Sequence, residues 1–440
     1  MRRLAILIGV ISALLSGSFA HAQESGVSRH PMEALSPDEV AKAVELLKAA
    51  GLADGNTFYP QIALFEMPKA AVLAWTPGAP VTRKADVIFR KAGETYEALV
   101  DLDAGNVVSS REVPGAEPMI LDGEWNLARD RFMADPRFKA ALARRGYAAD
   151  GTSVFCTPAS AGYFPGEGYE GRRILKIPCY DSNQKLHPQL ARPIEGLMGV
   201  VDSETGEVLA VIDNDVVPLP PAPKGYGSDL PPPRPPLNPV DIVADLGGNI
   251  RISGNLEIGW LDWSFHVRPD KRAGLILSLV RFDDNGRNRL IAYRMNVSEM
   301  FVPYMDPNPE WAYRTFMDVG EFGLGYLISS LREGADCPVS ALYADLTFPG
   351  DDGSVYTRKS ALCIFERATG DPAWRHSSGS QNPPDSRPEI ELVVRHIPTL
   401  GNYDYVIDYV FQPRGAIKLR VGATGFDAIK SVTAANMGDA

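Results

Sequence analysis

The segment from Pro218 to Pro239 constrains the fold of this chain most, because ten of its 22 positions are proline. It reads PLPPAPKGYGSDLPPPRPPLNP. Proline fixes φ and lacks a backbone N–H, so this stretch forms neither a helix nor a central strand. We therefore interpret residues 218–239 as a semi-rigid extended linker that separates two parts of the chain.

Before the linker, the sequence repeats one pattern, in which a helical segment precedes several alternating strands. Residues 36–51 form the first expected helix, with Ser36 as its N-cap. Residues 128–146 form the second. The two stretches close on similar hairpins, VDLDAGNVV and VDSETGEVL. We predict two small tandem α+β modules over residues 30–120 and 124–217, each a helix on an antiparallel sheet.

After the linker, the pattern changes to short alternating strands with Gly, Asp and Asn turns, such as GLILSLVRFDDNGRNRLIAYRM. Helical signals are scarce there. This sequence pattern is typical of an antiparallel β-sandwich, which we place at residues 240–440. A chain of 440 residues also exceeds what one core usually holds. The predicted fold class is therefore α+β with several domains.

The first residues, MRRLAILIGVISALLSGSFAHAQ, have a basic start, a short apolar run and small residues before Ala22. This pattern predicts a signal peptide over residues 1–22 and export to a bacterial periplasm. The apolar run is too short to span a bilayer. The net charge of −11 argues against nucleic acid as a partner, since nucleic-acid binding needs basic patches.

The four cysteines fall into two local pairs, Cys156 with Cys179 and Cys337 with Cys363. In an exported chain this spacing favours two disulfides, each closing a loop of about 25 residues and contributing on the order of 3 kcal/mol. No CxxC motif or Cys/His cluster favours metal binding instead. The sequence leaves open whether Cys156 and Cys179 are bridged.

Three short segments contain side chains suited to catalysis. TFMDVGEFGLG contains Asp318, EMFVPYMDP contains Tyr304, and TLGNYDYVIDYVF contains Tyr403. An aspartate among apolar residues has a raised pKa, which suits a general base near neutral pH. Each residue also has an ordinary reading, as a solvated turn aspartate or a packed strand tyrosine. His266 and His396 lie on strand patterns, and no HxH or HxxxH pair is present.

Taken together, these segments resemble the copper amine oxidases. The resemblance runs from about His30 to the end and includes RPPLNPVDIV, the stretch from WLDWSFHVRPD to FVPYMDP, and FMDVGEFGLG. Its most specific part is Asn402-Tyr403-Asp404-Tyr405. In that family, bound copper and O2 oxidise the tyrosine of this motif in place to topaquinone. The resemblance implies a primary-amine oxidase that converts a primary amine, O2 and water to an aldehyde, ammonia and hydrogen peroxide.

The resemblance also implies a role for each site residue. Tyr403 becomes the quinone, and Asp318 is the catalytic base that removes the substrate Cα proton. Tyr304 hydrogen-bonds the quinone oxygen, and Asn402 helps to hold the ring and the substrate. Phe316 lies at the end of the substrate channel.

Further implications concern partners and covalent structure. The resemblance pairs Cys337 with Cys363 and implies a homodimer for the intact protein. Phe316 and Phe322 beside Asp318 favour aromatic monoamines, such as phenylethylamine or tyramine, as substrates.

The expected copper ligands do not occur in the sequence. Relatives bind copper through three histidines C-terminal to the quinone, and this chain has no histidine after His396. We therefore expect a C-terminally truncated chain whose copper histidines lie beyond Ala440, with an incomplete sandwich and no activity alone. One alternative is a non-enzymatic exported binding protein that retains the N-terminal modules. Another is an unrelated adhesin, for which the NYDY and FMDVGEFGLG motifs would be accidents.

Overall fold

The computed structural model describes residues 29–183, 190–219, 235, 248–379, 383–434 and 436. The predicted signal peptide at residues 1–22 lies outside these ranges, and so does most of the predicted linker at residues 218–239. Within the described ranges, no helix combines the length and apolarity needed to cross a membrane.

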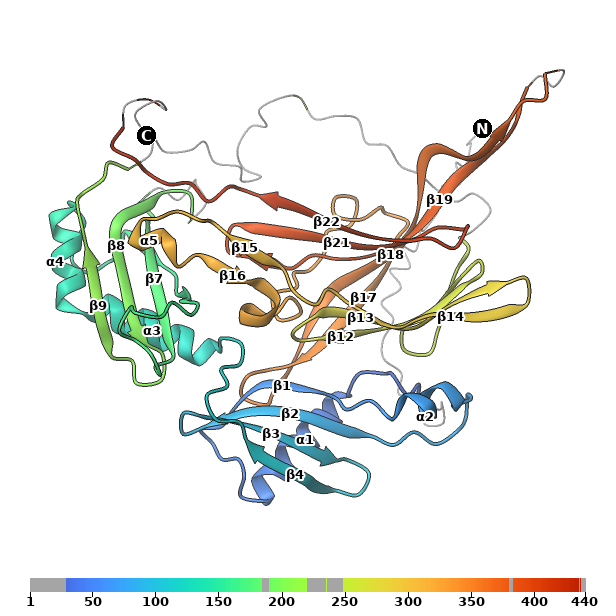
Figure 1. The fold of residues 1–440 in the computed structure, drawn as a ribbon, viewed down its shortest axis with the longest axis horizontal. Coiled ribbons are helices and arrows are strands. Elements are labelled where there is room, and N and C mark those ends of the chain that lie inside the picture. Colours follow the sequence, from blue (N-terminus) through green and yellow to red (C-terminus); the bar gives the residue numbers. More distant parts are fainter. Residues whose placement is uncertain are drawn as a thin grey trace, which may run out of the picture.

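The first folded unit is a four-stranded antiparallel sheet with a helix against it (Figure 1). The helix α1 begins where predicted, because the Ser36 side chain accepts from the Glu39 N–H and the Glu39 carboxylate accepts from the Ser36 N–H. Its buried side chains pack into one core with the sheet. The elements are α1 (Pro37–Ala49), β1 (Phe58–Leu64), α2 (Lys69–Ala74), β2 (Lys84–Lys91), β3 (Glu94–Asp101) and β4 (Asn106–Glu112).

The second unit pairs two helices with another antiparallel sheet, ordered β5-β7-β8-β9 with β6 beside β7 (Figure 1). The prediction of a single helix over residues 128–146 is wrong, because two helices occupy this region. The chain becomes helical earlier and breaks at Asp135, because Pro136 starts a new helix that the Asp135 side chain caps. The elements are α3 (Asp122–Ala134), α4 (Pro136–Arg144), β5 (Val154–Cys156), β6 (Ala159–Ser160), β7 (Ile174–Asp181), β8 (Pro193–Asp202) and β9 (Val208–Asp213).

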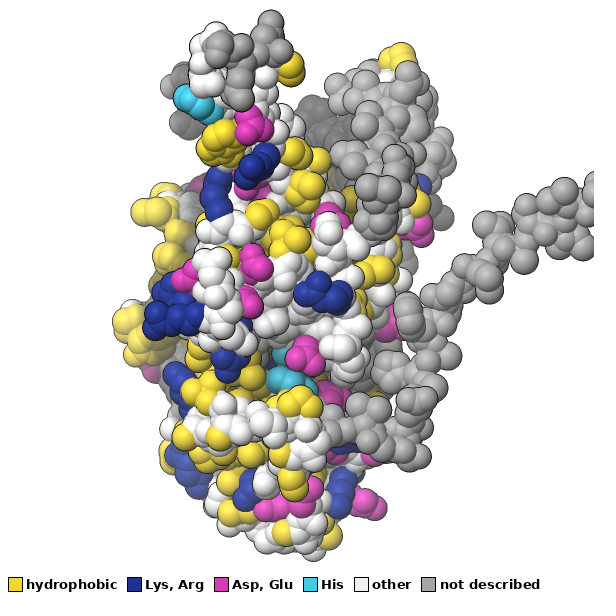
Figure 2. All heavy atoms as spheres, turned by 90° about the vertical axis from the view of Figure 1, so that its right-hand side faces the viewer, with side chains coloured by type: hydrophobic (Ala, Val, Ile, Leu, Met, Phe, Trp, Pro, Cys, Tyr) yellow, Lys and Arg dark blue, Asp and Glu magenta, His cyan; other side chains and the backbone are white. Residues whose placement is uncertain are grey.

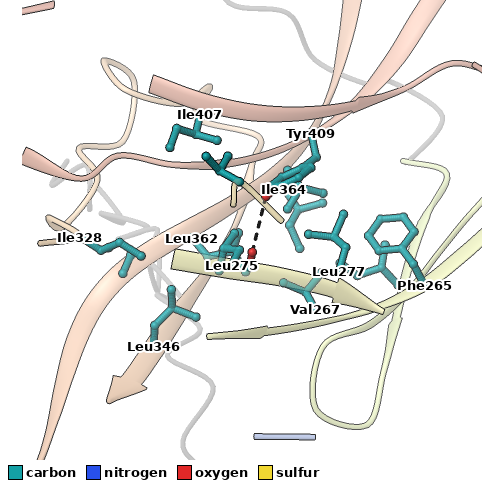
Figure 3. Close-up of a cluster of buried hydrophobic side chains, with 14 of the residues drawn as sticks. Phe265, Val267, Leu275, Leu277, Ile328, Leu346, Leu362, Ile364, Ile407 and Tyr409 are labelled. Atoms are coloured by element: carbon teal, nitrogen blue, oxygen red, sulfur yellow. Dashed lines mark hydrogen bonds between the residues drawn. The ribbon is translucent and has the colours of Figure 1, made fainter. Parts of the chain in front are cut away.

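The remaining described residues form two large antiparallel sheets that share one core, and a small two-stranded sheet of β15 and β16. Figure 3 shows Val267, Leu275 and Leu277 from one sheet facing Ile364, Ile407 and Tyr409 from the other. The first sheet runs β10-β11-β12-β13-β14, and the second runs β17-β18-β19-β21-β20 with β22 on β21. This is a mostly antiparallel β fold, as expected for this part of the chain.

The bounds of the first of these sheets are β10 (Ile250–Ser253), β11 (Glu257–Trp260), β12 (Trp263–Asp270), β13 (Gly274–Asp284) and β14 (Arg287–Met295). Those of the second are β17 (Leu342–Pro349), β18 (Val355–His376), β19 (Asp385–His396), β20 (Thr399–Leu400), β21 (Tyr403–Phe411) and β22 (Ile417–Gly425). Between the sheets in sequence lie β15 (Phe301–Pro303), α5 (Pro309–Ala312), β16 (Thr315–Met317) and the π-helical turn η1 (Asp318–Phe322). The strands β18 and β19 extend beyond their sheet as a long hairpin (Figure 1).

Both candidate disulfides are formed. Cys156 and Cys179 occupy opposed positions on the paired strands β5 and β7, and their sulfurs are bonded. Cys337 is bonded to Cys363 of β18, as the family resemblance implied. The pairings close loops with sequence separations of 23 and 26 residues.

The surface charge is mixed on the face seen in Figure 2. Where side chains are drawn there, basic and acidic groups are interspersed and do not gather into a basic stripe.

Candidate active site

A cavity of about 400 Å³ lies where three parts of the chain meet. One wall comes from the start of α3 and the residues before it, a second from the β5–β8 sheet, and a third from β15, β16, η1 and β21. The lining is largely aromatic and apolar, with a few polar groups, which is typical of small-molecule sites. It includes Leu121, Trp125, Tyr180, Tyr304, Tyr313, Arg314, Phe316, Asp318, Phe322, Tyr326, Asn402, Tyr403, Tyr405, Ala428 and Ile429.

Asp318 lies where β16 ends and the π-helical turn η1 begins. Its N–H donates to the Met300 carbonyl at 2.9 Å. The turn itself is capped by Glu299, whose carboxylate accepts from the Val319 N–H at 2.8 Å and the Gly320 N–H at 3.1 Å. A negative side chain at this end satisfies N–H groups that have no partner within the turn. Cap and backbone together fix where the Asp318 side chain enters the cavity.

Asp318 is buried, with 5% of the residue's surface exposed. Its Oδ2 accepts a hydrogen bond from the Tyr405 hydroxyl at 3.0 Å. Burial raises the pKa of Asp318 to about 6, the hydrogen bond from Tyr405 opposes this, and the charges of Glu321 and Glu299 add to it. A carboxyl with this pKa can accept and release a proton near neutral pH.

Tyr403 and Tyr405 project from one face of β21, because alternate residues of a strand share a face. Their rings stack with centroids 6.3 Å apart. The half-buried Tyr403 accepts hydrogen bonds from the Tyr304 hydroxyl at 3.2 Å and from the Ala428 N–H at 3.3 Å. Burial raises the pKa of Tyr304, and so does its contact with Tyr403. The Tyr304 hydroxyl therefore stays protonated at neutral pH and can donate.

Asn402 lines the cavity but hydrogen-bonds away from it. Its Nδ2 donates to the Phe426 carbonyl at 2.7 Å, and the Phe426 N–H returns a bond to the Asn402 carbonyl at 3.0 Å. These two bonds fix the segment after β22 against the start of β21. They thereby bring Ala428 within reach of the Tyr403 hydroxyl.

Phe316 belongs to an aromatic cluster along the cavity wall. Its ring lies edge-on to those of Tyr304, Tyr313 and Phe322, with centroid distances of 6.2, 6.3 and 5.8 Å. Edge-to-face packing of this kind stabilises a rigid apolar wall. The structure thus brings Asp318, Tyr403, Tyr304, Asn402 and Phe316 to one cavity.

The cavity lining includes side chains that the sequence did not assign to the site, among them Tyr405, Leu121 and Trp125. Tyr405 was visible two residues after Tyr403, and strand periodicity alone places both side chains on one face. Leu121 and Trp125 carry no comparable local signal, because their place in the cavity depends on contacts far along the chain.

The histidines of the described residues do not assemble a metal site. His396 is fully buried with neither ring nitrogen hydrogen-bonded, and burial lowers its pKa to about 3. Its Nε2 would lie 2.7 Å from a Cβ at Gly274, so this nitrogen faces backbone. His266 is buried and stacks on His30 with centroids 4.5 Å apart.

Across the described ranges, no cluster of three or more His, Cys, Asp or Glu side chains could hold a metal ion. The described residues therefore do not fit copper. The Tyr403 ring does fit a quinone position, because it borders the cavity beside Asp318 and its oxygen has two hydrogen-bond donors.

Comparisons with known proteins identify the family. Three models of copper amine oxidase domains match the chain: the N2 domain over residues 30–113, the N3 domain over residues 124–227 and the enzyme domain over residues 251–439. The chain is 36% identical over 420 residues to a primary amine oxidase of Klebsiella aerogenes, covering 93% of this chain and 54% of that protein. It is 33% identical to the copper-containing amine oxidase gamma 1 of Arabidopsis thaliana, covering 93% and 59%.

A solved structure agrees in fold. The copper-containing benzylamine oxidase of Hansenula polymorpha superposes with a TM-score of 0.79 at 23% identity, covering 91% of this chain and 65% of that one. The chain belongs to the copper amine oxidase family. It spans a little over half the length of these two curated relatives.

Proposed function

We propose that this chain contains the amine-binding cavity and the quinone-forming tyrosine of a primary-amine oxidase. The reaction is oxidation of a primary amine by O2 and water to an aldehyde, ammonia and hydrogen peroxide. The observation that supports this best is the meeting of Asp318, Tyr304 and Tyr403 in one largely aromatic cavity. The family membership of the chain supports the same chemistry.

The proposal extends to the organisation of the protein. Residues 30–120 and 124–217 are two α+β modules, residues 218–239 link them to the next domain, and residues 240–440 are part of the catalytic sandwich. The signal-peptide pattern at residues 1–22 supports export to the periplasm. The intact protein would be a homodimer, as the family resemblance implies.

Asp318 is the proposed base. A quinone at Tyr403 would supply a carbonyl for the amine and an acceptor for its electrons. Asp318 then takes the proton from the amine-bearing carbon on Oδ1, while Oδ2 stays hydrogen-bonded to Tyr405. Tyr304 donates to the oxygen of the Tyr403 ring and sets its orientation. Because no copper site fits the described residues, we derive no step through the metal.

The aromatic wall supports a preference for aromatic monoamines. We expect Phe316→Ala to weaken the binding of 2-phenylethylamine about tenfold, since aromatic contacts contribute on the order of 1 kcal/mol beyond buried area. Binding of n-butylamine should change much less. Calorimetric titration of both amines checks this, with Phe301→Ala on the exposed side of β15 as the matched control. Equal losses for both amines would remove the basis for an aromatic substrate.

Quinone formation and amine turnover test the function itself. We would fuse this chain to the part of the Klebsiella aerogenes relative that the match does not cover. Copper and O2 would then be added to the fusion protein. The fusion should give a redox-cycling quinone stain and release peroxide on amine addition, and Tyr403→Phe should abolish both. A folded, copper-loaded fusion with neither signal would refute the oxidase proposal in favour of a binding protein.

A further inference from the structure

The hydroxyl of Tyr405 is the one hydrogen-bond donor to the Asp318 carboxylate within the described part of the chain. We propose that Tyr405 is a positioning residue, which holds Oδ2 of Asp318 so that Oδ1 is presented to the substrate. This inference rests on the proposed role of Asp318 as the base. It assigns a function to the second tyrosine of the NYDY motif, which the proposed function does not use.

Both the backbone and the ring of Tyr405 are held in place. The Tyr405 N–H donates to the Pro398 carbonyl at 3.0 Å, and the residue pairs with Ala423 of β22. The ring is 8% exposed and packs against Tyr403. A side chain fixed by a strand and by a neighbouring ring keeps its hydroxyl in one place, which a positioning residue requires.

The charged groups around Asp318 do not stabilise its carboxylate in place of the hydrogen bond from Tyr405. Glu321 accepts from the Ser160 hydroxyl at 2.7 Å and from the Met317 N–H at 2.9 Å, and Glu299 caps η1. Both carboxylates repel a negative charge on Asp318. Arg314 borders the same cavity, yet no Lys or Arg of the described residues acts on the Asp318 carboxyl as an ion-pair partner. Tyr405 therefore supplies the direct stabilisation of the ionised base.

The hydrogen bond from Tyr405 also links Asp318 to the strand that carries the Tyr403 ring. Tyr403 and Tyr405 share one face of β21, so the hydrogen bond couples the orientation of the Asp318 carboxylate to the strand that bears Tyr403. Removing the Tyr405 hydroxyl while keeping its ring should free the Asp318 carboxylate to rotate. It should also make the ionised form of Asp318 less stable.

The test is Tyr405→Phe in the full chain, with Tyr409→Phe as the matched control. Tyr409 lies on the same strand, is 1% exposed, and donates to the Leu275 carbonyl at 3.5 Å in the sandwich core (Figure 3), so its hydroxyl does not bond Asp318. Infrared titration of protein labelled with ¹³C-aspartate follows the protonated carboxyl band, and the band absent from Asp318→Asn identifies the group.

In the wild type and in Tyr409→Phe this band should titrate with a midpoint near pH 6. In Tyr405→Phe the midpoint should move up by about one pH unit, with a shifted carbonyl frequency. An unchanged midpoint and frequency in Tyr405→Phe would overturn the positioning role and leave the oxidase proposal intact. A wild-type midpoint at the ordinary value for aspartate, unmoved by either variant, would instead count against Asp318 as the base.

Discussion

Replacing Gly325 with alanine is expected to lower the free energy of unfolding of the sandwich by about 3 kcal/mol or more. A Cβ at Gly325 would lie 1.9 Å from the Asp270 carbonyl oxygen, 2.8 Å from the Asp270 carbonyl carbon and 3.0 Å from the Cα of Lys271. All three atoms are backbone. No side-chain rotation can relieve the clash, so one of the two chain segments must move.

The close approach at Gly325 is held by backbone hydrogen bonds on both sides. The Leu324 N–H donates to the Arg272 carbonyl and the Tyr326 N–H to the Lys271 carbonyl, both at 2.9 Å. Moving the segments apart strains these bonds and disturbs the end of η1, the turn that begins at Asp318. Gly325→Ala should therefore also weaken amine binding in the cavity.

The control for this prediction is Gly422→Ala on β22, where the nearest atom to a new Cβ is the Cβ of Val406 at 3.7 Å, an ordinary contact. Its effect should stay within about 0.5 kcal/mol. Urea unfolding followed by tryptophan fluorescence compares the two variants, because Trp260 and Trp263 are buried in the sandwich core. Similar losses in both variants would mean that the clash at Gly325 is relieved at little cost.

The parts of this fold that could be predicted from sequence are those fixed by near neighbours. Ser36 caps α1 because its partner Glu39 is three residues away. The extent of the second helical region was wrong because residues 128–146 were treated as one helix, although Pro136 starts a second helix that Asp135 caps. Both helices bury a phenylalanine, Phe132 and Phe138, so one apolar surface is divided between two helices by a cap.

In the candidate site, too, the features set by near neighbours in sequence were predictable and those set by distant contacts were not. The sequence pointed to Asp318 and Tyr403 because each lies in a short contiguous motif, and both line the cavity. The hydrogen bond from Tyr405 to Asp318 joins positions 87 residues apart, and the wall formed by Leu121 and Trp125 comes from the chain between two sheets. Contacts of this kind depend on how separate units pack, and a single sequence has no local signal for that.

Asp318→Asn is expected to raise the free energy of unfolding at pH 8 by up to about 3 kcal/mol, and to change it little at pH 4. Burial raises the pKa of this carboxyl from 3.8 to about 6 in the folded protein. Between these values the folded state binds more protons than the unfolded state, so stability falls as the pH rises through that window. Above pH 6 the full cost of a buried charge is present. The amide removes it and can still accept from Tyr405.

Urea unfolding of Asp318→Asn at pH 4, 6 and 8 measures this dependence, with Asp427→Asn as the control because Asp427 is exposed and directly precedes Ala428 of the cavity lining. The control should show no gain at pH 8. A stabilising substitution at Asp318 would mean that the chain retains a charge against its own stability, which is expected of a residue kept for proton transfer. If Asp318→Asn instead destabilised the protein equally at pH 4 and pH 8, the carboxylate would be compensated in the folded state, and the case for a poised base would fail.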